Sequence, residues 1–197
     1  MRVHSLADLL AELAPPALAA DWDNSGWQVR LEDTPLRGVM LSLDATPDVV
    51  AEACATGCNL LVTHHPLFFR PLRLLEADSL VGSTALSAVR GGLSILAVHT
   101  NLDAAPNGTS WALATALGLE GGTLLAAHAT PGAGYGVIAR AEPRTLAEWA
   151  ALAETRLGSP PLALSGDPVS RHEIVAVMGG SGASLQDHAA RACWASW

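Results

Sequence analysis

Two spacings of hydrophobic positions alternate along the first half of the chain and predict a βαβ pattern. Leucines at helical spacing predict a first helix over residues 5–14, which Pro15 and Pro16 end. Continuous apolar runs predict buried strands at 38–43, 59–63 and 93–99. Amphipathic segments with polar caps predict helices at 46–55, 79–90 and 108–118. This alternation indicates an α/β fold with a mostly parallel sheet flanked by helices.

The composition changes after Gly118 and predicts a second lobe. Residues 118–134 are rich in Gly and Ala and are expected to form a connection. Further elements are predicted as a strand at 135–141, a helix at 145–157 and short strands at 161–164 and 173–178. We expect the last strand to return to the first sheet. The predicted organisation is a metal-binding α/β domain of residues 1–118 plus 171–197, and a small α+β lobe of residues 119–170.

Charge and hydropathy exclude several classes of protein. The 197 residues carry a net charge of −8, and all 11 basic residues are Arg, with no cluster that would serve nucleic acid. No apolar run reaches the roughly 20 residues that span a bilayer, and the N-terminus is too acidic for a signal peptide. We therefore expect a cytoplasmic protein that binds neither membrane nor nucleic acid. Cys54 and Cys58 lack a second ligand pair for zinc and are interpreted as buried small hydrophobes.

His64 and His65 stand where a buried strand gives way to Pro66. Functional groups of a parallel sheet gather beyond the carboxyl ends of its strands. Neighbouring side chains on a strand point to opposite faces, so adjacent histidines converge poorly on one ion. At a strand end the turn relaxes this, and the two imidazoles would reach two neighbouring ions. The alternative is a pair of polar residues satisfied by the backbone.

A second polar segment, His99 to Asp103, follows the next strand in the same way. Both segments are expected to open at one edge of the sheet, which brings together three imidazoles and a carboxylate. Imidazole suits Zn, Fe, Ni or Mn, and a carboxylate bridges two ions. Asp103 has an alternative role as a turn residue that bonds its own backbone, which the following Pro106 and Asn107 support. The combination of both segments favours a metal site.

Other candidate residues are weaker. The Gly-rich residues 179–184 resemble an anion-binding nest and nearly match the G-x-S-x-G elbow of serine hydrolases. Ala183 stands where the second Gly belongs, and no suitably spaced Asp and His follow Ser181, so tight strand–helix packing is favoured. His4, His128, His172 and His188 have no suitable partners. Trp22, Trp27 and Trp111 are interpreted as core or interface residues rather than as stacking residues for a ligand.

Five segments together resemble the Nif-three-like dinuclear metal-centre family, whose members are named type 2 homologues of GTP cyclohydrolase 1. They are WDNSGWQV (22–29), LSLDATPDVVAEA (41–53), NLLVTHHPLFF (59–69), LAVHTNLDAAPNG (96–108) and VAVMGGSGASL (175–185). The resemblance implies two divalent metal ions, of Zn, Fe, Mn or Ni, held by His64, His65 and Asp103. His99 matches a family position near the site, and Asp44 is a candidate for supporting the ligands. The family also implies a toroidal homohexamer and a small-molecule substrate.

The family continues past residues 179–182 to a C-terminal H-x-x-x-E segment that completes both metal spheres, and this sequence has none. We therefore expect a chain incomplete at its C-terminus that keeps half of a dinuclear site. Two functions stay open. One is a metal-dependent hydrolase acting on a nucleotide or phosphate-containing substrate, with GTP ring opening suggested by the family name. The other is a non-catalytic metal-binding or scaffold protein of hexameric assembly. The residues identify no general base.

Overall fold

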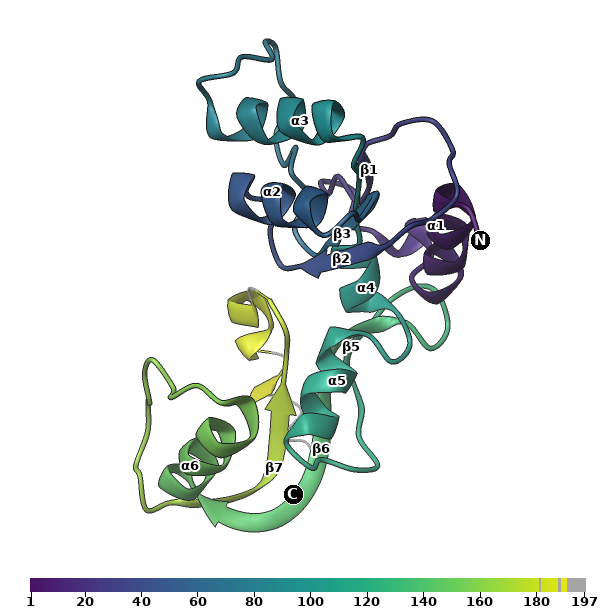
Figure 1. The fold of residues 1–197 in the computed structure, drawn as a ribbon. Coiled ribbons are helices and arrows are strands. Elements are labelled where there is room, and N and C mark those ends of the chain that lie inside the picture. Colours follow the sequence, from purple (N-terminus) through teal and green to yellow (C-terminus); the bar gives the residue numbers. More distant parts are fainter. Residues whose placement is uncertain (181, 188, 191–197) are drawn as a thin grey trace. The chain divides into compact units, whose positions relative to one another are not determined.

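The computed structural model describes residues 1–180, 182–187 and 189–190 (Figure 1). The chain divides into one unit that spans Met1–Leu102 and a second that starts at Asp103. Ser181 and His188, weighed above as candidates, lie outside the described residues, as does the segment 191–197 with Cys193. Every helix in the described part of the chain is too short or too polar to cross a membrane.

The first unit is built on a four-stranded sheet of order β1-β4-β3-β2. Strands β2, β3 and β4 are parallel, and β1 pairs antiparallel with β4 at the edge. This confirms the mostly parallel sheet that the sequence predicts. The elements are α1 (Val3–Leu13), a short 3-10 helix (Pro16–Leu18), β1 (Gly26–Val29), β2 (Val39–Ser42), α2 (Pro47–Ala55), β3 (Leu60–Thr63), α3 (Leu80–Gly91) and β4 (Ser94–Ala97).

Local sequence explains most of the element boundaries. The Thr46 hydroxyl accepts a hydrogen bond from the Val49 N–H at 3.3 Å, so Thr46 caps α2 and the helix begins one residue after the predicted start. Ser79 caps α3 in the same way, through the Gly82 N–H at 3.0 Å. Helix α1 begins at Val3, earlier than the predicted start at residue 5. Strand β1 is not among the elements predicted above.

The core of the first unit lies between the sheet and helices α2 and α3, which lie side by side (Figure 1). Every residue of β3 and β4 is buried, and Leu60, Leu61 and Ile95 have no exposed surface. Side chains alternate between the two faces of a strand, so complete burial requires cover on both faces. Helix α1 packs near β4, where Ala7 and Leu10 line a small cavity together with Leu96. The continuous apolar runs in the sequence follow from this double cover.

The second unit contains a three-stranded antiparallel sheet of order β5-β6-β7. Its elements are α5 (Thr109–Ala116), β5 (Thr123–Ala127), β6 (Gly134–Thr145), α6 (Leu146–Leu157), β7 (Arg171–Val177) and a short 3-10 helix (Gly182–Leu185). Helix α4 (Thr100–Ala104) contains the division between the units. A second core forms where α5 and α6 residues pack with β6 and β7, around Val137 and Ala139.

Three expectations for this half of the chain differ from the structure. The Gly- and Ala-rich residues 118–134 contain β5, and residues 161–164 are irregular rather than a strand. Strand β7 pairs with β6 instead of returning to the parallel sheet. The physical reason for the different partner of β7 is that an alternating pattern predicts a strand but does not specify what it pairs with. The two units divide between Leu102 and Asp103, and the organisation into residues 1–118 plus 171–197 and 119–170 stays a prediction.

Candidate metal centre

Two neighbouring parallel strands bring the predicted histidines to one edge of the sheet. Thr63, the last residue of β3, pairs with Ala97, the last residue of β4. Hydrogen bonds continue beyond the strand ends, from the His64 N–H to the Ser42 carbonyl at 3.1 Å and from the His65 N–H to the Leu43 carbonyl at 2.9 Å. The backbone that carries the histidines is therefore held by the sheet rather than by a loose loop.

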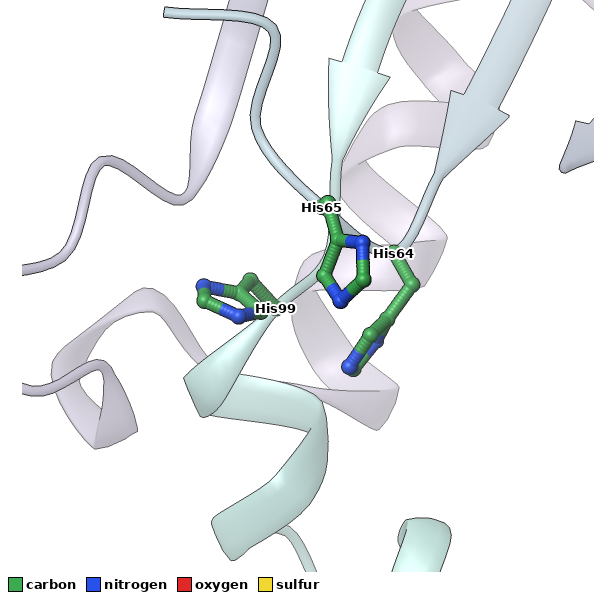
Figure 2. A group of neighbouring side chains, drawn as sticks. All are labelled: His64, His65 and His99. Carbon is green, nitrogen blue, oxygen red and sulfur yellow. The ribbon is translucent and has the colours of Figure 1, made fainter. Parts of the chain in front are cut away.

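His64, His65 and His99 face a common space (Figure 2). The ring centroids lie 5.1 Å apart for His64 and His65, 5.1 Å for His64 and His99, and 5.5 Å for His65 and His99. One ligand nitrogen from each ring lies within 4.8 Å of the others. The turn after β3, where the Thr63 hydroxyl donates to the His65 carbonyl at 2.8 Å, lets adjacent histidines converge despite strand alternation.

The hydrogen bonds of the three rings determine which nitrogen carries the proton. The Nδ1 atoms lie next to the Val98 carbonyl for His64, the Asp44 carboxylate for His65 and the Asp23 carboxylate for His99, at 3.1, 2.8 and 2.8 Å. A carbonyl or carboxylate oxygen only accepts, so each neutral ring must donate from Nδ1. The lone pair is then on Nε2, the arrangement found in histidines that bind metals.

The cluster therefore fits a divalent cation in its chemistry. Zinc binds histidine nitrogen at about 2.0–2.1 Å, so three nitrogens around one ion lie roughly 3.4 Å apart. The cluster, with nitrogens within 4.8 Å, reaches that spacing when each moves by about 1 Å or less. Rotation about the side-chain bonds supplies such a movement.

Asp23 supports a histidine of the cluster that is largely buried. Its side chain has no exposed surface, and that of His99 is 13% exposed. Burial raises the pKa of Asp23, but hydrogen bonds from His99, Ser25 and Thr100 outweigh this effect and hold the pKa well below its usual range. Asp23 is thus ionised at neutral pH and aligns the His99 ring from behind.

The opposite side of the cluster is open to solvent. Asp44 holds His65 through the same kind of contact, but their side chains are 55% and 46% exposed. One side of the site is therefore rigid and dry, and the other is accessible to a ligand.

The structure places the remaining predicted residues as follows. Asp44 lies against His65, and His99, expected either as a ligand or as a support for the ligands, belongs to the cluster itself. Asp103 lies in α4, where its Oδ1 accepts a hydrogen bond from the Thr109 hydroxyl at 2.6 Å. It belongs to the second unit, and its assignment as a metal ligand stays a prediction.

Asp23 is the residue that the sequence interpretation missed. It lies in the segment WDNSGWQV that carries part of the family resemblance, but no role was assigned to it. Its partner His99 is 76 residues away in the chain, so no local spacing reveals the pair. The only sequence feature that pointed to Asp23 was its position, as an acidic residue, in a turn-forming segment that this chain shares with the family.

Comparisons with known proteins find relatives in sequence and in fold. The sequence model of the Duf34/NIF3 family (NGG1p interacting factor 3) matches residues 1–193. A Clostridium acetobutylicum protein named GTP cyclohydrolase 1 type 2 homolog is 29% identical over 192 residues, which are 96% of this chain and 72% of the relative. A Streptomyces coelicolor protein of the same name is 34% identical over 193 residues, 95% of this chain and 68% of the relative. The crystal structure of a Staphylococcus aureus protein superimposes with a TM-score of 0.90 at 26% identity, covering 98% of this chain and 76% of the other.

Proposed function

The chain belongs to the Duf34/NIF3 family, and on that premise we propose that it binds divalent metal ions through His64, His65 and His99. One observation carries the proposal: the Nδ1 atom of every ring in the cluster faces an oxygen that only accepts, which places the lone pair of each neutral ring on Nε2. As the family resemblance implies, we propose two ions, with Asp103 as a further ligand.

We further propose that the bound metal serves hydrolysis of a nucleotide or another phosphate-containing substrate. The name GTP cyclohydrolase 1 type 2 homolog, carried by the relatives, supports this class of reaction. A bound divalent ion lowers the pKa of a water ligand and stabilises negative charge that develops on a substrate oxygen. The protein's own residues contribute orientation: Asp23 and Asp44 hold the rings of His99 and His65. Substrate would approach from the exposed side, at His65 and Asp44.

The decisive experiment for metal binding compares single histidine variants. Wild type, His64→Ala, His65→Ala and His99→Ala are incubated with Zn²⁺ or Mn²⁺, desalted and analysed for bound metal by mass spectrometry. His172→Ala is the matched control, because His172 is an exposed histidine of β7 outside the cluster. We expect bound metal to be lost in the three cluster variants and kept in the control. Full retention of metal by His65→Ala would refute the site.

A second experiment tests hydrolysis separately from metal binding. The metal-loaded protein is incubated with a panel of nucleoside mono-, di- and triphosphates, and products are separated by chromatography. We expect turnover that requires added metal and disappears in His65→Ala. Stoichiometric metal without turnover would instead favour the non-catalytic metal-binding or scaffold protein.

Assembly is a separate part of the proposal. The family resemblance implies a homohexamer, and light scattering coupled to gel filtration measures the mass of the assembly directly. A mass corresponding to a monomer of 20.3 kDa would contradict the hexamer.

A further inference from the structure

Two exposed aromatic side chains lie beside the histidine cluster. Trp22 is 64% exposed and Phe69 is 53% exposed, which excludes the core role considered for Trp22. Their ring centroids lie 6.0 Å apart at an interplanar angle of 61°. Both rings also contact His99 edge-on, with centroid distances of 6.1 Å from Trp22 and 6.5 Å from Phe69. The two aromatic rings thus adjoin a residue of the proposed metal site.

Hydrogen bonds hold the two loops that carry these rings. The Asn24 side chain donates to the Phe68 carbonyl at 2.7 Å, which ties the loop of Trp22 to the loop of Phe69. Gln28, itself only 8% exposed, accepts from the Phe68 N–H at 2.9 Å and donates to the Asn24 carbonyl at 2.7 Å. The backbone of the two loops that carry Trp22 and Phe69 is therefore held in place by neighbouring polar groups. A binding surface that is already ordered loses little conformational entropy when a ligand arrives.

The mutual contacts of the rings leave much of their surface uncovered. Edge-to-face contacts are favourable for aromatic pairs, but each of the two residues is still more than half exposed to water. A flat ring that lies on this surface would remove apolar area from water and gain stacking energy. The same segment carries Arg70 and Arg73, both exposed, which would suit an anionic group on the same ligand.

We propose that Trp22 and Phe69 form a stacking platform for a planar heteroaromatic ring of nucleobase size. This inference rests on the proposed metal site, because the platform would hold the ring of the substrate while another group of it reaches the histidines. It assigns the substrate to ring-containing anions and gives Trp22 and Phe69 a direct binding role. The ring of His99 forms the boundary between the platform and the metal site.

The test compares a probe that contains a ring with one that lacks it. Binding of GMP and of ribose 5-phosphate is measured by calorimetry, with and without Zn²⁺, on wild type, Trp22→Ala, Trp22→Phe and Phe69→Ala. Leu74→Ala is the matched control, since Leu74 is 68% exposed in the same loop and carries no aromatic ring. We expect Trp22→Ala to weaken GMP binding by about 5- to 150-fold, the range measured for stacking of one base. Trp22→Phe should retain most of the affinity, and Leu74→Ala all of it.

Several results would overturn the platform. Equal affinities of wild type and Trp22→Ala for GMP would do so, as would wild-type affinities that are the same for GMP and ribose 5-phosphate. An unchanged GMP affinity together with a smaller assembly in Trp22→Ala would show that the rings form a contact between copies of the chain.

Metal content separates this inference from the proposed function. Trp22→Ala should keep its metal while it loses GMP affinity. If the protein binds metal but binds GMP no more tightly than ribose 5-phosphate, only the platform is refuted. If it binds GMP more tightly than ribose 5-phosphate but binds no metal, only the metal site is refuted.

Discussion

Replacing Asp23 by Asn tests whether the buried carboxylate prepares His99 for metal binding. Oδ1 of Asp23 accepts from the Asn24 N–H and from His99 Nδ1. Oδ2 accepts from the Thr100 N–H and from two hydroxyls. An asparagine amide has one oxygen and one NH₂ group, so in either orientation its NH₂ faces a backbone N–H. If the NH₂ group faces His99, the ring must accept at Nδ1 and carry its proton on Nε2.

The size of the effect follows from these contacts. Loss of a partner that orients a metal-binding histidine typically weakens metal affinity by about 10- to 100-fold, or roughly 1.4–2.7 kcal/mol. The mismatched amide also leaves a buried donor unsatisfied, which costs about 1–3 kcal/mol of folding free energy. Asp44→Asn is the matched control, because it makes the same chemical change at a side chain that is 55% exposed. Solvent competes for the Asp44 contact, so we expect a smaller loss of affinity there.

The assay is a Zn²⁺ titration in competition with a chromophoric chelator, accompanied by circular dichroism to establish that each variant is folded. We expect the Zn²⁺ affinity to fall in the order wild type, Asp44→Asn, Asp23→Asn. A folded Asp23→Asn protein with wild-type Zn²⁺ affinity would refute the argument that the Asp23 carboxylate sets the tautomer of His99.

Two further predictions concern stability. Leu61→Ala removes a side chain with no exposed surface from the central strand pair, so we expect a loss of about 2–5 kcal/mol in denaturant unfolding; a loss below about 1 kcal/mol would contradict the packing described. At the start of α6, the Thr145 N–H bonds the Glu148 carboxylate and lowers the pKa of Glu148 from its ordinary 4.5. Because the folded pKa is the lower one, this contact stabilises the protein above pH 4.5 and is lost as the pH falls below it. Glu148→Gln should therefore lower the melting temperature more at pH 7 than at pH 3; an equal effect at both pH values would disprove this.

Short-range sequence features account for many of the elements in the first unit. The start of α2 is marked by Thr46 and Pro47, and α3 is bounded by Ser79 and Gly92. These ends can be read from the sequence because Thr46, Ser79 and Gly92 make their capping contacts within a few residues. Partner choice depends on contacts that no local pattern encodes. Strand β7 was expected in the parallel sheet and instead extends the antiparallel one.

The sequence by itself determined that His64, His65 and His99 follow neighbouring buried strands, since such strands need continuous apolar runs and the carboxyl ends of parallel strands share one edge. Only the tertiary structure decided what lies behind and beside these histidines. Antiparallel pairing of β1 with β4 sets Gly26 opposite Ala97, and this register brings the residues before Gly26 next to those after Ala97. Asp23 reaches His99, and Trp22 comes to lie against its ring, because a strand pairing joins segments more than 70 residues apart.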